Sequence, residues 1–132
     1  MSKLIRNSNQ AKQGIDFYGL QNGPMHPSDI DAVLEFDNKA IIFIELKKIN
    51  NDIPTGQRLL LERLTDSWHT KKAITIKATH SFKNDNNDVP LHLCQVQKFY
   101  YDGKWTYFSE NLKVFLNKLG LKWKITKLKF DE

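Results

Sequence analysis

Three charged side chains at the end of an apolar segment have the residue types that hydrolytic sites use. Glu45 and Lys47 follow the apolar run that begins at Ala40, and thirteen residues separate Asp31 from Glu45. Residues two apart in a strand point to the same face, so Glu45 and Lys47 are expected to project together. Two carboxylates and an ammonium can hold a divalent cation and activate water. The same types could instead form a salt-bridged cluster, and the sequence leaves both interpretations open.

The elements that must position these side chains are the two strands of a hairpin. Residues 31–36 and 40–47 have strand patterns, and Asp-Asn-Lys at 37–39 is a turn. A three-residue turn places Phe36 opposite Ala40, and the same register places Asp31 opposite Glu45, with Cβ atoms about 5 Å apart. A two-residue turn would shift the register by one residue and move Asp31 to the other face.

Two carboxylates this close repel each other unless a cation lies between them. Oxygen ligands suit Mg²⁺ or Mn²⁺, which keep bound water and accept phosphate oxygens. Such a metal lowers the pKa of its water and polarises a phosphoryl oxygen. An adjacent Lys47 could orient or deprotonate that water. The pattern therefore predicts metal-dependent phosphodiester hydrolysis.

The order Asp31, thirteen residues, then Glu45-Leu46-Lys47 resembles the signature of the PD-(D/E)XK nuclease superfamily, which includes restriction endonucleases and Holliday-junction resolvases. In many members the next helix carries a glutamine of the site. Here Gln57 begins a predicted helix and shares a face with its leucines. The segment 27–31, with the Glu-Leu-Lys and Gly-Gln-Arg that follow, is similar to small phage-borne members.

The resemblance implies a restriction-endonuclease-like fold and a role for each matching residue. The implied catalytic residues are Asp31, Glu45, Lys47 and Gln57. Asp31, Glu45 and the backbone carbonyl of Leu46 would bind Mg²⁺, with Asp29 as the fallback ligand. Lys47 would activate water, and Gln57 would orient a phosphate or the lysine. Many small relatives act as dimers, so the resemblance also implies a homodimer.

The remaining segments predict helices interleaved with strands, which favours one α/β domain with a central mixed sheet flanked by helices over residues 1–132. The motif hairpin and its helix occupy 29–68. The other predicted elements are a short helix over 3–13, a helix over 57–68, strands over 73–79, 91–101 and 104–108, a helix that Ser109 caps and Gly120 ends, and a last strand over 121–125.

The net charge of +5 is concentrated in the C-terminal segment 111–130, which carries six lysines and no acid. Interleaved with Trp123 and Phe130, these lysines suit a polyanion, although a solvated lysine face has the same pattern. The chain has 17 Lys and 3 Arg, which favours contacts to the DNA backbone over reading of bases. The candidate DNA-binding residues are Lys48, Arg58, Lys122 and Lys124.

Several classes of protein are excluded or disfavoured by composition. Cys94 is the single cysteine, so no intramolecular disulfide can form. The longest apolar run has five residues, too short for a membrane span, and no signal peptide precedes it, so we expect a cytoplasmic protein with no membrane partner. No phosphate-binding P-loop motif is present. The alternative to a nuclease is a non-catalytic DNA-binding or inhibitor module that retains the fold.

Overall fold

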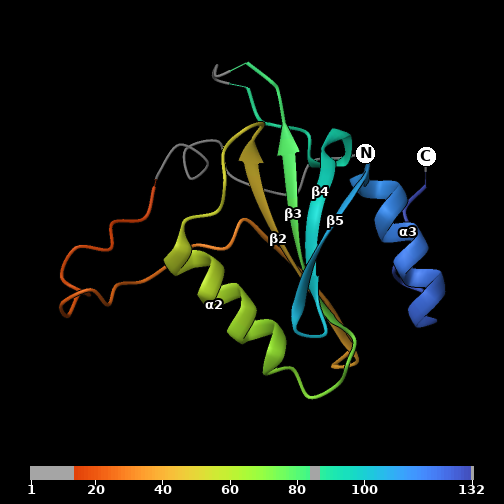
Figure 1. The fold of residues 1–132 in the computed structure, drawn as a ribbon, viewed down its shortest axis with the longest axis horizontal. Coiled ribbons are helices and arrows are strands. Elements are labelled where there is room, and N and C mark those ends of the chain that lie inside the picture. Colours follow the sequence, from red (N-terminus) through yellow and green to blue (C-terminus); the bar gives the residue numbers. More distant parts are fainter. Residues whose placement is uncertain (1–13, 84–86, 132) are drawn as a thin grey trace.

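The computed structural model describes residues 14–83 and 87–131, which form one five-stranded mixed sheet (Figure 1). The strands lie in the order β1-β2-β3-β4-β5, and all neighbours are antiparallel except β2 and β3. Their bounds are Ala32–Phe36, Ala40–Lys48, Ala73–His80, Gln95–Tyr101 and Lys104–Asn111. Two α-helices, α2 (Thr55–Asp66) and α3 (Leu112–Trp123), cover opposite faces of this sheet. The predicted α/β class is confirmed.

The first hairpin has the three-residue turn on which the predicted register depends. Asp37 and Asn38 adopt the left-handed conformation, with φ of 52° and 64°, and the Lys39 N–H donates to the Phe36 carbonyl. Short polar residues tolerate this conformation better than branched ones. Phe36 is therefore paired with Ala40, as expected, and the ladder continues to Ala32 opposite Ile44.

The larger part of the core lies between the sheet and α3. Even-numbered residues of β2 and β3, such as Ile44 and Ile76, point to this face and meet Leu116 of the helix. The odd-numbered residues face α2, where the apolar contacts are fewer and centre on Phe43 and Leu61. Both central strands are covered on both sides, which explains their nearly continuous apolar sequences. The thinner core under α2 leaves room for charged residues.

The predicted helix over 57–68 exists but begins and ends two residues earlier, directly after Pro54. The predicted strand over 91–101 is wrong at its start, because Leu91–Leu93 form a 3₁₀ turn and β4 begins at Gln95. The predicted helix over 3–13 lies outside the described residues. Neither α2 nor α3 has the length and apolar character that a transmembrane span requires.

The end of the chain differs most from expectation. Ser109 does not cap α3, because β5 continues to Asn111, whose side chain accepts from the Val114 N–H at 3.1 Å. The helix also runs past Gly120 to Trp123. No strand forms over 121–125, because the chain turns at Lys124 in the left-handed conformation and folds back on the helix. In this segment Trp123 and Ile125 are buried by the helix end and the returning chain, whereas Leu121 is exposed.

Candidate functional site

The predicted acidic pair forms where the hairpin opens, on the face that α2 covers. Glu45 is completely buried, and neither of its carboxylate oxygens has a hydrogen-bond partner within the described part of the chain. Asp31 directly precedes β1 and is exposed, and its Oδ2 accepts from the Leu46 N–H at 2.7 Å. The register of the hairpin, extended by one residue, sets Asp31 opposite Glu45. The structure therefore brings the two predicted carboxylates together.

The surroundings of Glu45 make it hard to ionise. Burial is the main cause and the adjacent Asp31 carboxyl is the second, and together they raise the pKa of Glu45 to about 8. The positive charge of Lys47 and the Asp31 backbone N–H lower the pKa of Glu45, but by less. Near neutral pH the pair therefore retains a proton. A cation bound between the carboxylates would take the place of that proton.

The donors fit a magnesium ion better than a metal that needs a complete protein cage. The two orphaned oxygens of Glu45 and the Asp31 carboxylate supply anionic ligands. The N–H and C=O of one strand residue point to the same side, so the Leu46 carbonyl faces the Asp31 edge as well. Within residues 14–83 and 87–131, no group of three or more His, Cys, Asp or Glu side chains gathers as a metal site. Two carboxylates with waters and substrate oxygens suffice for Mg²⁺.

Lys47 and Gln57 lie near this pair, in different situations. Lys47 is half-buried, two residues after Glu45 on the same face, and forms no ion pair within 4 Å with any described residue. Gln57 lies in the first turn of α2, and its Nε2 donates to the Asp29 carbonyl at 2.9 Å. This bond joins the helix to the segment that leads into Asp31. Asp29 itself is exposed and precedes the ladder.

Two buried lysines on the same face were not predicted from the sequence. Across the sheet, Glu45 of β2 pairs with Lys77 of β3, which pairs with Lys98 of β4. Both lysines are buried, at 2% and 8% exposure. The Oδ1 of Asp52, in the loop before α2, lies 3.2 Å from Lys77 Nζ and 3.4 Å from Lys98 Nζ. In the sequence each lysine occupies an alternate position of its strand, as a solvent-facing lysine would, and only the pairing of the strands places them together.

Aromatic rings and an acid of α2 complete this side of the sheet. Lys98 Nζ lies 5.0 Å from the centroid of the Trp105 ring and 5.6 Å from that of Tyr107. Glu62 accepts hydrogen bonds from Trp105 Nε1 and from Arg58, each at 2.7 Å. These donors lower the pKa of Glu62, with the Trp105 bond as the main cause. Arg58, a predicted DNA contact, is therefore engaged within its own helix.

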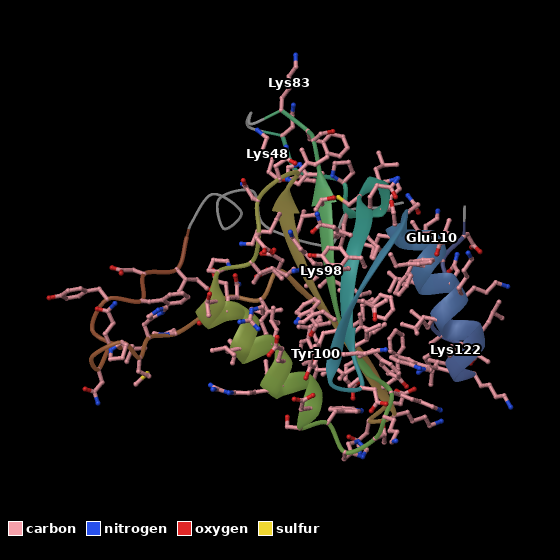
Figure 2. All side chains as sticks on the ribbon, in the orientation of Figure 1. Lys48, Lys83, Lys98, Tyr100, Glu110 and Lys122 are labelled. Atoms are coloured by element: carbon pink, nitrogen blue, oxygen red, sulfur yellow. The ribbon has the colours of Figure 1, made fainter. Side chains whose placement is uncertain are left out.

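The other predicted DNA contacts are not gathered on one surface. Lys48 is exposed at the end of β2, beyond Lys47 and close to the acidic pair along the strand (Figure 2). Lys122 and Lys124 belong to the end of α3, across the sheet from that pair. Trp123 between them is buried in the core, so its ring is not available to a polyanion. In the same segment, Lys118 pairs with Glu110, and Lys127 pairs with Asp37.

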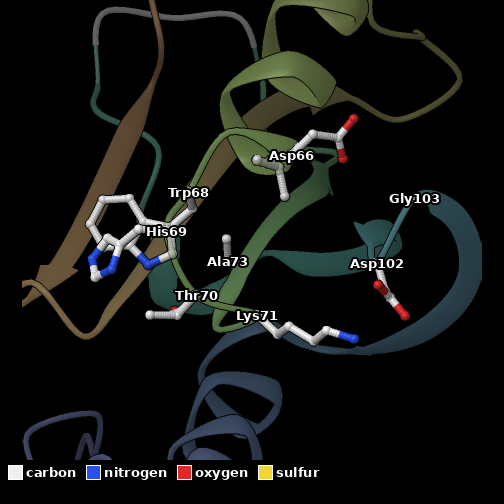
Figure 3. A pocket seen from close by; sticks show the side chains of 9 residues that line it. Asp66, Trp68, His69, Thr70, Lys71, Ala73, Asp102 and Gly103 are labelled. Carbon is white, nitrogen blue, oxygen red and sulfur yellow. The ribbon is translucent and has the colours of Figure 1, made fainter.

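Figure 3 shows a hollow of about 460 Å³. It lies at the start of β3 and therefore at the opposite end of the sheet from the acidic pair, which is at the end of β2. It is formed by the end of α2, the start of β3 and the Asp102–Gly103 turn. Asp66 on its rim accepts two hydrogen bonds from the Tyr100 hydroxyl, at 2.9 and 3.0 Å. None of the predicted catalytic, metal-binding or DNA-binding residues lines this hollow.

Comparisons of the chain with protein-family models, with curated proteins and with solved structures found no match.

Proposed function

We propose that this protein is a metal-dependent DNA nuclease of the PD-(D/E)XK type that hydrolyses phosphodiester bonds. The observation that carries the proposal is the buried Glu45 carboxyl, set opposite Asp31 at the end of a hairpin, whose two oxygens have no hydrogen-bond partner among the described residues. A buried carboxylate without a donor costs folding free energy, so a fold that keeps one has a use for it. A divalent cation satisfies both acids at once.

Each residue of the site has a role that follows from its place. Asp31, Glu45 and the Leu46 carbonyl would hold Mg²⁺ or Mn²⁺, which would supply an acidified water and neutralise phosphate charge. Lys47, half-buried and without an ion pair among the described residues, is placed to orient that water and to offset charge on the phosphorus oxygens. Gln57 holds the Asp29 carbonyl and thereby positions the segment that carries Asp31.

The partner is DNA, recognised through its backbone. Lysines outnumber arginines 17 to 3, and lysine supplies point charge rather than the planar fork that reads guanine. Lys48 and Arg58 are the candidate phosphate contacts on the side of the acidic pair. A cytoplasmic location and a homodimer belong to the same proposal.

A cleavage assay with linear duplex, circular single-stranded and branched DNA tests the proposal. Mg²⁺, Mn²⁺ and EDTA are compared for the natural protein, Lys47→Ala and the control Lys104→Ala, an exposed lysine at the start of β5. We expect metal-dependent cutting that Lys47→Ala abolishes and Lys104→Ala leaves intact. Salt-dependent binding without cutting would instead identify a non-catalytic DNA-binding module. Neither cutting nor binding would leave the acids and Lys47 as a structural cluster.

A further inference from the structure

Lys77 and Lys98 are unusual because two ammonium groups are buried side by side with one carboxylate between them. Their side chains are 3% and 10% exposed, whereas that of Asp52 is 72% exposed. Burial of an ammonium is costly unless its N–H donors find acceptors. Each Nζ has three donors, and the ion pairs of the described residues give each lysine only Asp52. The pair therefore carries more positive charge than the fold neutralises.

Glu45 does not supply the missing negative charge. It lies beside Lys77 in the ladder, yet its oxygens have no hydrogen-bond partner within the described residues. The Lys77 ammonium lies 3.2 Å from Asp52 Oδ1 instead, in the loop before α2. The two acids lie at the start of β1 and on β2, and the two lysines lie on β3 and β4. The acidic pair and the lysine pair are therefore neighbours in one row across the sheet.

Asp52 is a replaceable partner. The Ile53 backbone N–H and then Lys77 hold its pKa down to about 2, so it is anionic at all relevant pH values. It lies in a loop between β2 and α2, and its side chain is mostly in water. The place of an anion between the two lysines is therefore taken by a carboxylate that is itself mostly exposed to water. A backbone phosphate presents the same kind of oxygen acceptors and the same single negative charge.

Two aromatic rings of β5 lie beside the lysine pair. Trp105 and Tyr107 of β5 lie within 5.0 and 5.6 Å of Lys98 Nζ, and Tyr107 is 73% exposed. A low-dielectric wall strengthens the attraction between an ammonium and an incoming anion. An exposed tyrosine beside a phosphate position also offers a ring on which a base can stack.

We infer that Lys77 and Lys98 bind a backbone phosphate of DNA next to the one held at the acidic pair, and that Asp52 occupies this phosphate position in the free protein. The inference rests on the proposed nuclease function for its substrate. Neighbouring strands are about 4.8 Å apart, so Lys77 lies one strand and Lys98 two strands from Glu45 in the same row.

Binding of a fluorescent single-stranded 12-mer in EDTA, measured as a function of salt, tests this inference without any cutting. The variants are Lys77→Met, Lys98→Met and Asp52→Asn, with Lys104→Met as the control for loss of one exposed lysine. Methionine keeps the apolar stem, and circular dichroism checks that each variant is folded. We expect each buried-lysine variant to bind about tenfold more weakly and to lose about one phosphate contact from the salt slope. Lys104→Met should change neither.

Asp52→Asn distinguishes a phosphate position from a structural tether of the loop. Removal of the competing charge should strengthen 12-mer binding, because both lysines are then free for the probe. If the three groups only tether the loop, Asp52→Asn will lower thermal stability without strengthening binding, and the inference is overturned. Unchanged binding in both lysine variants while the natural protein cuts DNA would also overturn it and leave the nuclease intact. Lost binding in those variants without any cutting would support the anion position and reject the nuclease.

Discussion

Glu45 should make the metal-free protein less stable as pH rises. Its pKa is about 8 in the folded protein against an ordinary value of 4.5. Below pH 4.5 the carboxyl is neutral in both states, so it costs nothing. Between pH 4.5 and 8 the unfolded chain loses this proton while the folded chain keeps it, and stability falls. Above pH 8 the carboxyl is ionised in both states, so stability falls no further. The total loss in the free energy of unfolding follows from the difference in pKa and is roughly 5 kcal/mol.

Glu45→Gln removes this penalty because the amide has the same shape and no charge. In EDTA we expect the variant to match the natural protein near pH 4.5 and to exceed it by up to roughly 5 kcal/mol at pH 9. For a chain of this size the difference is roughly 15–20 °C in Tm. Urea unfolding at pH 4.5, 7 and 9 measures it directly.

Glu62→Gln is the matched control, since Glu62 lies on the same face but Trp105 and Arg58 lower its pKa. A lowered pKa contributes stability above the unfolded value, so this variant should be less stable than the natural protein at pH 7. Mg²⁺ should then stabilise the natural protein at pH 8, by about 2.7 kcal/mol at 100 times its Kd, and should not stabilise Glu45→Gln. Parallel pH curves for Glu45→Gln and the natural protein would refute the reasoning, as would equal stabilisation of both by Mg²⁺.

Three further substitutions test contacts of the fold away from the acidic pair. Gly120→Ala would place a Cβ 1.9 Å from the Leu128 carbonyl oxygen. We expect the free energy of unfolding, measured with urea, to fall by about 1–3 kcal/mol. A neutral result would contradict the packing of the C-terminal segment on α3. Asn111→Ala removes the side-chain cap of α3 and should lower the free energy of unfolding by about 1 kcal/mol, which is followed as a lower Tm. An unchanged Tm would mean that the cap contributes nothing. Tyr100→Phe deletes the hydroxyl that donates to Asp66. It should abolish the tyrosine ionisation near pH 12, which is followed by ultraviolet absorbance. If the ionisation near pH 12 persists in the variant, it belongs to another tyrosine.

The acidic pair could be predicted because it depends on local sequence. A turn of three short polar or charged residues fixes the register of the hairpin, and the register fixes which side chains are opposite. Asp31 and Glu45 are therefore placed by residues within fifteen positions of one another. The side on which they lie follows from strand alternation. Nothing beyond the hairpin is needed to bring them together.

The lysine pair could not be predicted in this way, because it depends on the order of the strands. Lys77 and Lys98 are 21 residues apart and meet through the β3–β4 ladder, which has a register shift after Lys77. Asp52 reaches them from a third segment. Binary patterning treats a lysine in a strand as a surface residue, and here the thin core under α2 leaves space that charged groups fill. The last predicted strand failed for a related reason, since burial by a folded-back chain end imitates alternation.

The two charged groups on this face depend on each other. Without a cation, the acids at Asp31 and Glu45 repel any phosphate that approaches Lys77 and Lys98, and part of that repulsion is avoided only because Glu45 keeps a proton. A bound Mg²⁺ would balance the two carboxylates, two positive charges against two negative ones, and would leave the second position unchanged. Lys47 and the lysine pair would then supply the excess charge, so a DNA strand would no longer meet net negative charge along the row. Metal and DNA should therefore strengthen each other's binding by the same factor, as linkage requires. The arrangement gives a reason for keeping an uncompensated carboxylate and an uncompensated ammonium pair within two strands of each other.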